Sequence, residues 1–453
     1  MKLLKLLEQP EGKTLEFKRD LSSPEGVLRT IVAFANTAGG SLIIGIEDRT
    51  GHVRGVSNPL DVEERLASLI SDRIAPRLVP ELEIMPWRRT HLLTVTVYPS
   101  PVRPHRLLRT GKDDQFLVRV GSTNRTAGPE LIEELRRSVR TTGFDEEPMV
   151  DLNSEAIDFR AASESFADVR KLRPADLESL RLVTEHQGKK VPTVAGVLLF
   201  GKNREQYFPD AWIQVGRFRG TTRSKIEDHR ALRRYPTDAI AEAIAFVQKH
   251  SLLSAEIGAH KRTDRWSIPP PAVREAVINA VVHADYSQRG APIRLSIFDD
   301  RLEIENPGLL PFGLTIDDIK LGVSKLRNHI IGRVFHSLGL IEQWGSGIGR
   351  MTEACEEAGL AAPKLEEIGT HFRVTIYTDK VAEPLIDEKD EAILRVLDDD
   401  NGHSTSEIAK AIGLSARATR SRLIRLIDRS LVREVGTSPQ DPKRRYYRTK
   451  STG

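Results

Sequence analysis

The sequence predicts a multidomain α+β fold, and three observations lead to that prediction. First, residues 11–130 combine short strand patterns with one helical pattern, as an α+β module does. Second, the chain has 453 residues and 39% apolar residues, which corresponds to roughly three domains, each with its own hydrophobic core. Third, the composition changes after Thr378, where short amphipathic helical patterns precede two strand patterns over residues 431–447.

Bulk composition excludes several classes of protein. The formal net charge of +4 is small for this length, so a nucleic-acid surface must come from local clustering of charge. The single cysteine, Cys355, excludes an internal disulfide framework, and no Cys/His spacing predicts a structural zinc site. The sequence has no apolar run near twenty residues and no signal-peptide pattern. We therefore expect a cytoplasmic, soluble protein with no membrane partner.

The N-terminal region predicts a strand, a helix and then further strands. Residues 11–20 alternate, with Leu15 and Phe17 directed inward. A helix from about Pro24 ends at residues 36–40, where glycines permit positive φ. The strands expected after it cover residues 41–46, 53–56, 92–97 and 116–120, and a turn at 48–51 joins the first two as a hairpin.

Five short motifs of this region occur together: Leu15-Glu-Phe-Lys18, Phe34-Ala-Asn-Thr-Ala-Gly-Gly40, Gly45-Ile-Glu-Asp48, Arg103-Pro-His105 and Val118-Arg-Val-Gly-Ser122. With these motifs, residues 1–135 resemble the Schlafen-like, Alba-type nucleic-acid-binding domain. The resemblance implies that basic and polar side chains of the sheet contact the phosphates of DNA, or of RNA: Lys18, Arg103, His105, Arg119 and Arg125. Such contacts release counterions, so binding should weaken as salt increases.

An alternative for the same domain is nuclease activity. Some Schlafen relatives are endoribonucleases with three acidic residues, and Glu11, Glu16 and Asp48 match that acidic pattern. Three convergent carboxylates can bind divalent metal ions and activate water for phosphodiester cleavage. The structural alternative is that Glu16 pairs with Lys18 or Arg119 and that Asp48 is an ordinary turn residue.

Residues 136–267 predict a linker followed by a middle α/β region without chemistry of its own. The acidic, polar run 143–149 indicates the linker, and a helix begins near Pro174 and Asp176. The remaining patterns predict buried strands over residues 191–200 and 211–217, and a helix over residues 237–250. We assign this region to packing or subunit contacts.

Two segments of residues 268–380 predict a nucleotide pocket when they are taken together. A helical pattern over residues 274–287 places Glu275 and Asn279 four apart on one face, where a carboxylate can activate water and an amide oxygen can hold a cation that carries phosphates. Residues 342–351 form a glycine-rich turn that opens another helix. Such a turn lets backbone N–H groups approach an anion at a helix N-terminus.

With the Glu305-Asn-Pro-Gly308 turn, these segments resemble the divergent branch of the GHKL ATPase superfamily over residues 268–378. The resemblance implies that Glu275 is the hydrolytic base and that Asn279 holds Mg²⁺ for ATP. It places Asn306 and Gly308 on the adenine side and Gly345, Gly347 and Gly349 at the phosphates, and the expected binding set also includes His283, Asp285 and Ser346. The usual adenine-reading Asp is replaced by Asn306-Pro-Gly308, so the resemblance predicts nucleotide binding with at most weak ATPase activity. The alternative is that this domain is a degenerate relative of the ATPases, which binds no nucleotide and serves only as a scaffold.

The C-terminal residues 387–450 predict a helix-turn-helix followed by two strands. Ser404 and Glu407 offer capping groups to one helix, Gly413 makes the turn, and Ser415 caps the next helix. This outline resembles the winged helix-turn-helix family. The resemblance implies DNA contacts from the second helix and from the wing: Arg417, Arg420 and Ser421 toward base edges, and Lys443, Arg444 and Arg445 toward phosphate or the minor groove.

The complete arrangement looks like bacterial proteins called predicted transcriptional regulators, some of which carry a helicase label. No Gly-x-x-x-x-Gly-Lys-Ser/Thr phosphate loop is present, which argues against a conventional helicase motor. We therefore expect a DNA-binding, nucleotide-binding regulator of transcription, whose affinity for DNA is modulated by ATP or ADP. The expected partners are DNA, the nucleotide with Mg²⁺, and further copies of the chain in a homodimer or higher homo-oligomer. The competing hypothesis is the divalent-metal nuclease.

Overall fold

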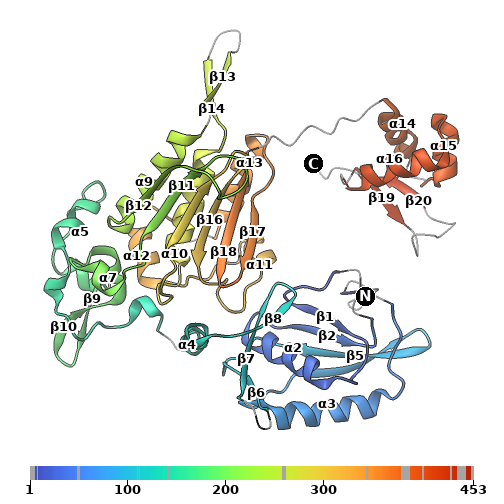
Figure 1. Ribbon diagram of the computed structural model, residues 1–453, viewed down its shortest axis with the longest axis horizontal. Coiled ribbons are helices and arrows are strands. Elements are labelled where there is room, and N and C mark those ends of the chain that lie inside the picture. The colour runs from blue at the N-terminus through green and yellow to red at the C-terminus, as the bar shows by residue number, and fades with distance from the viewer. Residues whose placement is uncertain are drawn as a thin grey trace. The chain divides into compact units, whose positions relative to one another are not determined.

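The chain forms two compact units, residues 1–380 and 381–453, and each is described by itself (Figure 1). The computed structural model describes residues 6–7, 9–47, 52–109, 111, 113–139, 142–251, 253–257, 262–342, 345–378, 388–399, 402–428, 431–435 and 445–449. Both units mix helices and strands, which confirms the predicted α+β, multidomain fold class. No described helix is long and apolar enough to cross a membrane.

The first unit begins with an N-terminal module, the described part of residues 6–139. Its elements are β1 (Leu15–Lys18), α2 (Pro24–Asn36), β2 (Gly40–Ile44), α3 (Pro59–Arg73), β3 (Ile74–Ala75), β4 (Glu81–Trp87), β5 (Thr90–Val97), β6 (Arg106–Leu107), β7 (Gln115–Val120), β8 (Thr123–Thr126) and α4 (Pro129–Arg137). The described strands form two sheets, ordered β1-β2-β5-β4 and β3-β6-β7-β8.

Helix α2 follows the sequence pattern closely. Pro24 occupies its first turn, where a missing N–H does no harm, and its apolar face is buried against both sheets. Beyond the helix, Gly39 has a φ of 77°, and a Cβ atom there would lie 2.6 Å from the Val97 carbonyl oxygen. The predicted strand residues Leu15 and Phe17 are buried, as expected. The predicted hairpin is represented by an isolated antiparallel β-bridge between Ile46 and Val53, and its turn lies outside the described residues.

The rest of the first unit is a central domain, the described part of residues 142–378. Its helices are α5 (Phe159–Ser165), α6 (Asp176–Ser179), α7 (Val194–Phe200), α8 (Arg204–Tyr207), α9 (Pro236–His250), α10 (Pro270–His283), α11 (Ile316–Lys320), α12 (His329–Ser337) and α13 (Gly347–Glu357). Its strands are β9 (Val183–His186), β10 (Lys189–Pro192), β11 (Ile213–Phe218), β12 (Ile226–Leu232), β13 (Leu253–Ile257), β14 (Arg262–Trp266), β15 (Ile293–Ile297), β16 (Arg301–Pro307), β17 (Lys364–Ile368) and β18 (His371–Tyr377).

A mixed sheet organises the central domain. Its described strands run in the order β12-β11-β15-β16-β18-β17, with β11 and β15 parallel and the other neighbours antiparallel. Helix α10 packs on β16 and contacts α9 and α13, and its buried side chains belong to the same hydrophobic core as theirs. The sheet thus holds α10 and the N-terminal turn of α13 beside each other.

Two predictions for the middle region were wrong in part. Residues 191–200 were expected to form one strand, but β10 ends at Pro192 and α7 follows. The Thr193 side chain accepts a hydrogen bond from the Gly196 N–H and caps α7, and every residue of that helix is buried, so the apolar run fits a helix as well as a strand. The helix expected from Pro174 is the single turn α6. The predicted strand 211–217 and helix 237–250 correspond to β11 and α9.

The second unit contains α14 (Glu388–Val396), α15 (Thr405–Ile412), α16 (Ala416–Asp428), β19 (Val432–Val435) and β20 (Arg445–Arg448), and the two strands pair antiparallel. Ser404 and Glu407 form the predicted capping box of α15. Gly413 ends that helix with a φ of 66°, and the Ser415 hydroxyl accepts the Ala418 N–H at 3.2 Å. Local capping chemistry therefore sets this helix-turn-helix, as predicted.

Candidate nucleotide pocket and nucleic-acid surfaces

The two segments predicted to form a nucleotide pocket converge in the structure. Glu275 and Asn279 of α10 line one pocket together with Gly345 and Gly347 of the glycine-rich turn. The Asn279 Nδ2 atom donates a hydrogen bond to Glu275 Oε1 at 3.1 Å, so both side chains occupy the same wall. This hydrogen bond leaves the Asn279 amide oxygen available as a ligand for a hard cation.

The glycines of the turn are required by close contacts. Gly345 has a φ of 67°, and a Cβ atom there would lie 2.3 Å from the Gly322 carbonyl oxygen. A Cβ atom at Gly347 would lie 2.0 Å from Glu275 Oε1. Because neither position leaves room for a side chain, the first backbone N–H groups of α13 lie beside the α10 carboxylate, in a cradle of the kind that can hold an anion.

Arg350 is a pocket residue to which the sequence analysis gave no role. Its guanidinium lies 3.1 Å from Glu275 Oε2, pairs with Glu342, and donates to the Ser346 hydroxyl at 3.0 Å. The residue lies within the glycine-rich segment, three positions after Gly347 in a predicted helix. That spacing places both residues on one helix face, so the sequence could have indicated Arg350 as a pocket residue.

The remaining pocket walls are mostly apolar. They come from the segment after β16, from the region around α11 and from β18: Leu309, Leu310, Pro311, Leu314, Ile319, Val323, Leu326, Phe372 and Val374. Lys325 adds one cation, whose Nζ donates to the Phe312 carbonyl at 3.2 Å and whose pKa is lowered by burial. The cavity measures about 130 Å³, below the ~300–1,000 Å³ of ordinary ligand pockets. A bound nucleotide therefore requires these walls to separate.

The other predicted nucleotide residues are distributed unevenly around the pocket. Asn306 and His283 line it. Burial lowers the pKa of His283 to about 4, and its Nδ1 atom has no hydrogen-bond partner among the described residues. Ser346 accepts a hydrogen bond from Arg350, and Gly349 is exposed. Neither of these last two residues is in the lining of the cavity.

Asp285 and Gly308, which were expected to contact the nucleotide, lie outside the pocket lining and make contacts with each other and with the neighbouring loop. Asp285 is buried, and its carboxylate accepts hydrogen bonds from the Ser287 hydroxyl at 2.6 Å and from the Gln288 amide at 3.1 Å. It lies outside the pocket lining, because α10 ends at His283 and the chain turns away. Gly308 has a φ of 100°, and a Cβ atom there would lie 3.0 Å from the Asp285 Cβ atom.

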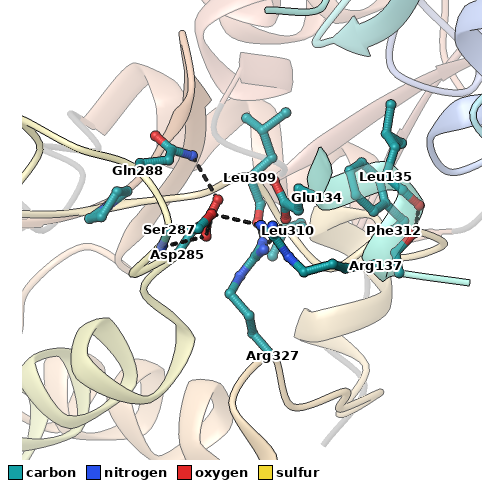
Figure 2. A network of polar contacts seen from close by, with 12 residues as sticks. Glu134, Leu135, Arg137, Asp285, Ser287, Gln288, Leu309, Leu310, Phe312 and Arg327 are labelled. Carbon is teal, nitrogen blue, oxygen red and sulfur yellow. Dashed lines mark hydrogen bonds and ion pairs between the residues drawn. The ribbon is translucent and has the colours of Figure 1, made fainter. Parts of the chain in front are cut away.

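The N-terminal module contacts the wall of the pocket directly (Figure 2). Glu134 of α4 pairs with Arg327, which also donates to the carbonyl of the wall residue Leu309. The Lys13 ammonium lies 2.6 Å from the Glu367 carboxylate, and that carboxylate accepts the Leu310 N–H at 2.9 Å. These contacts connect the segment after β16 to residues far away in the sequence.

Arg103 is a third contact between the module and this segment. Its guanidinium lies 5.3 Å from the centre of the Phe312 ring and donates to the Ser138 hydroxyl at 2.8 Å. Arg103 is buried, so its expected role as a phosphate contact is replaced by one in the junction.

His105 and Arg119 are also buried, which corrects their prediction as phosphate contacts. The His105 ring nitrogens lie 2.8 Å from the Pro76 carbonyl and 2.7 Å from the Ser100 hydroxyl. Arg119 is 1% exposed, and its guanidinium donates to the Gly12 carbonyl and to Glu16. A buried cation must be paired, and these partners provide that pairing.

Lys18 and Arg125 remain as predicted basic residues with access to solvent. Arg125 is exposed on β8, whereas Lys18 is partly buried and lies 2.7 Å from the Glu16 carboxylate. Of the three proposed nuclease acids, Glu16 is thus paired with Arg119 and Lys18, and Glu11 accepts the Phe17 N–H at 2.7 Å. Asp48 lies outside the described residues.

In the second unit, Arg420 is exposed on α16, the helix predicted to enter the major groove. The side chains of Arg417 and Ser421, and the wing residues Lys443 and Arg444, lie outside what the structure describes. The Arg445 guanidinium lies 2.6 Å from the Glu407 carboxylate and 3.2 Å from the Gly402 carbonyl, so part of its hydrogen-bonding capacity is used within the fold.

Three family models match the chain, in the order expected. The one described as "Schlafen, AlbA_2" matches residues 11–128. "Putative ATP-dependent DNA helicase recG C-terminal" matches residues 290–376, and "Winged helix-turn-helix DNA-binding" matches residues 386–433. The chain therefore has a Schlafen/AlbA domain, an ATPase-like domain of the RecG C-terminal type and a DNA-binding winged helix, which confirms the predicted architecture.

Two solved structures show similarity to the chain. The DIP2311 protein of Corynebacterium diphtheriae is 17% identical, with a TM-score of 0.43, and the match covers 96% of this chain and 95% of that chain. The N-terminal domain of a RecG-related protein from Nitrosomonas europaea is 26% identical, with a TM-score of 0.22, over 27% of this chain and 92% of that chain. No curated protein matches.

Proposed function

We propose that the chain is a cytoplasmic DNA-binding regulator, of transcription, whose affinity for DNA changes when ATP or ADP binds with Mg²⁺ between α10 and α13. The convergence of Glu275 and Asn279 with the glycine-rich turn supports this proposal most strongly. A carboxylate, an amide oxygen and a helix N-terminus without side chains are the groups that a metal–triphosphate ligand needs. The domains matched on either side supply the expected affinity for DNA.

The pocket residues fit Mg²⁺ and ATP in separable roles. Asn279 would hold the cation through its amide oxygen, and Glu275 would accept a proton from an attacking water. The backbone N–H groups that begin α13 and the Arg350 guanidinium would face negative charge. The apolar wall around Leu309 would enclose the base. ATP, when bound, contributes the phosphate charge to which these groups respond.

The junction with the N-terminal module supports a regulatory role. The small cavity must widen to admit a nucleotide, and Leu309 and Leu310 form part of its wall. The same two residues are fixed to the module through Arg327 with Glu134 and through Glu367 with Lys13. A ligand that favours a wider pocket therefore acts on the contacts of the nucleic-acid-binding module.

Thermal unfolding with increasing ATP, with and without Mg²⁺, tests nucleotide binding. A ligand of the native state at 100 times its Kd should add about 2.7 kcal/mol to the free energy of unfolding. We expect Asn279→Ala to remove the Mg²⁺-dependent part of this gain. Duplex DNA binding is then measured with and without ATP. An unchanged melting temperature at millimolar ATP excludes the nucleotide site, and unchanged DNA affinity with bound ATP excludes the regulation.

The nuclease alternative is settled by incubating labelled DNA and RNA with Mg²⁺ or Mn²⁺. The described residues contain no group of three His, Cys, Asp or Glu side chains that could hold a metal ion. Glu16 is paired with Arg119 and Lys18, so Glu16→Gln should destabilise the module. We expect neither the parent chain nor this variant to cleave DNA. If the parent chain cleaves nucleic acid and Glu16→Gln does not, the nuclease hypothesis would replace our proposal.

Size-exclusion chromatography with light scattering tests the expected homodimer.

A further inference from the structure

We propose that single-stranded nucleic acid binds in a cleft between the N-terminal module and the central domain, with Arg125 on one wall and Arg289 on the other holding its phosphates. This inference rests on the proposed affinity for nucleic acid, but it does not depend on nucleotide binding. It adds the central domain to the nucleic-acid surface, which the sequence analysis had confined to the N-terminal module and the winged helix.

The cleft is built by residues of both parts of the first unit. Strands β7 and β8 and the start of α4 form one wall, and the loop after α10 with the turn between β17 and β18 forms the other. The charged side chains of the described lining are Arg125, Arg289 and Glu130, and its one ring belongs to His371. The cavity between these walls measures about 740 Å³.

The charges of the cleft suit a polyanion. Arg125 and Arg289 are both exposed, and neither side chain makes an ion pair or hydrogen bond with another described residue. Glu130 is the one acidic side chain in the described lining. An arginine in water without a partner gains from a phosphate, because the guanidinium can donate two parallel hydrogen bonds to it. Two such arginines on opposite walls define a path for successive phosphates.

The wall that carries Arg289 is held firmly on both sides of that residue. Asp285 accepts hydrogen bonds from Ser287 and Gln288, and Arg137 of α4 donates to the Ser287 hydroxyl at 2.7 Å (Figure 2). The Gly290 N–H donates to the Asp210 carboxylate at 2.8 Å. The backbone of Arg289 is therefore fixed while its side chain is free. Fixed backbone and unpaired side chain are the features of a prepared binding residue.

The size of the cleft favours one strand over two. A cavity of about 740 Å³ falls within the ~300–1,000 Å³ of small-ligand sites. A short stretch of a single strand can enter it, whereas a duplex presents its backbone on a much broader surface. His371 is the one ring in the described lining, so base stacking contributes little and phosphate contacts dominate. We therefore expect binding that is salt-dependent and tolerant of sequence.

Fluorescence anisotropy of the full chain with a labelled single-stranded oligonucleotide, over a range of salt, measures these contacts. Each phosphate contact in a single strand contributes a slope of about 0.7 in log K against log salt, or roughly fivefold in affinity at 0.1 M salt. We expect Arg125→Ala and Arg289→Ala each to weaken binding by about that factor and to lower the slope by about 0.7. Arg289→Lys should keep the slope.

Matched controls are available on both parts of the first unit. Arg89, between β4 and β5, and Arg333 on α12 are exposed, make no described side-chain contact and lie outside the cleft lining. Alanine at either position should leave the affinity and the salt slope unchanged. Melting temperatures of all four variants should match the parent chain, because none of these side chains is packed. Equal losses in the controls and in the cleft variants would overturn the assignment.

Further measurements distinguish a failure of the cleft proposal from a failure of the proposed function as a whole. Arg420→Ala should weaken duplex binding and leave single-strand binding unchanged, since Arg420 belongs to the winged helix. A chain that binds neither duplex nor single strand contradicts the proposed function itself. A chain that binds single strands with the same slope in Arg125→Ala and Arg289→Ala contradicts the cleft alone. Equal losses for duplex and single strand in Arg289→Ala would reject the preference for one strand.

Discussion

A Cβ atom at Gly347 would lie 2.0 Å from the Oε1 atom of Glu275. The N-terminal turn of α13 is thus seated directly on the carboxylate of α10, although the two residues are far apart in the sequence. A negative side chain at a helix N-terminus is favourable, and so is a bound anion in the same place. The contact therefore places the predicted base where a phosphate would also be attracted.

Replacing Gly347 with alanine should separate binding from stability. The new methyl group must displace the Glu275 carboxylate, which is the flexible end of its side chain, and so must disturb the hydrogen bond from Asn279. Alanine is also better than glycine in a helix by up to about 1 kcal/mol. We expect a small change in the free energy of unfolding and the loss of stabilisation by ATP and Mg²⁺ in thermal unfolding.

Gly349→Ala is the control for that change. Gly349 lies in the same helix, and a Cβ atom there would meet nothing within 4 Å. The ATP-dependent stabilisation should survive in this variant. Equal retention of ATP binding by both variants would contradict the placement of phosphates at the N-terminus of α13.

Arg350→Ala should weaken ATP binding. Its guanidinium lies against Glu275 and faces the pocket, so it is the cation beside the proposed phosphate position. Loss of a hydrogen bond to a charged group corresponds to about 1.5–3 kcal/mol, or roughly 10- to 100-fold in Kd. Isothermal titration calorimetry measures the change, with Arg333→Ala as an exposed control. Tighter ATP binding in Arg350→Ala would show instead that Arg350 competes for the site.

Features with local causes could be predicted from the sequence. The α15 capping box needs side chains three residues apart, Ser404 and Glu407, and the αL end of that helix needs Gly413. Helical spacing and residue type also predicted the shared face of Glu275 and Asn279 and the open backbone of the glycine-rich turn. The convergence of these two segments is a long-range contact, and it was predicted from the ordered motifs that resemble the GHKL superfamily. Arg350 could have been included by the same spacing.

Features with distant partners could not be predicted in this way. The pair of Arg119 and Glu16 was expected only as the structural alternative to a nuclease site, and the Gly12 carbonyl that also contacts the Arg119 guanidinium was not expected. The Arg103 guanidinium likewise packs on the ring of Phe312, which belongs to the central domain on the other side of the junction. Sequence pattern shows that a cation is present but not whether a distant segment covers it. The wrong strand at residues 191–200 has a different cause, since a fully buried apolar run has no periodicity to separate strand from helix.

The burial of His283 predicts a dependence of stability on pH. Burial lowers the pKa of its imidazole to about 4, below the ordinary value of 6.5. Between these two values the unfolded chain binds a proton that the folded chain does not, so stability is complete above pH 6.5 and falls as the pH decreases toward 4. The loss is at most about 3 kcal/mol, by ~1.36 kcal/mol for each pKa unit.

Urea unfolding of the parent chain and of His283→Phe at several pH values measures this dependence. The variant carries no titrating ring, so its stability should change less between pH 6.5 and pH 4 than that of the parent. His336, which is exposed on α12, gives a control, and His336→Phe should keep the parental pH dependence. Parallel curves for the parent and His283→Phe would show that the pKa of His283 is the same in the folded and the unfolded chain, which contradicts the prediction.

The pair of Glu134 and Arg327 should carry the coupling between the pocket wall and the N-terminal module. Both side chains are largely buried, and burial lowers the pKa of Arg327 to about 10, which leaves it charged at neutral pH. Removing one partner of a buried pair costs about 3–5 kcal/mol, whereas replacing both with apolar residues is often neutral. Glu134→Leu and Arg327→Met should each destabilise the chain strongly, and the double variant far less than their sum.

The double variant also separates the binding sites from their coupling. It should retain stabilisation by ATP and retain DNA binding, but ATP should change the affinity for DNA much less than in the parent chain, because Leu309 is no longer tied to α4 through Arg327 and only the Lys13–Glu367 contact remains. The exposed pair of Glu133 and Arg136 on the same helix is the matched control, and Glu133→Ala should change stability by about 0–1 kcal/mol and leave the coupling intact. An ATP effect on DNA affinity that persists unchanged in the double variant would place the coupling in the Lys13–Glu367 contact or elsewhere, and strictly additive stabilities would show that the pair does not act as a unit.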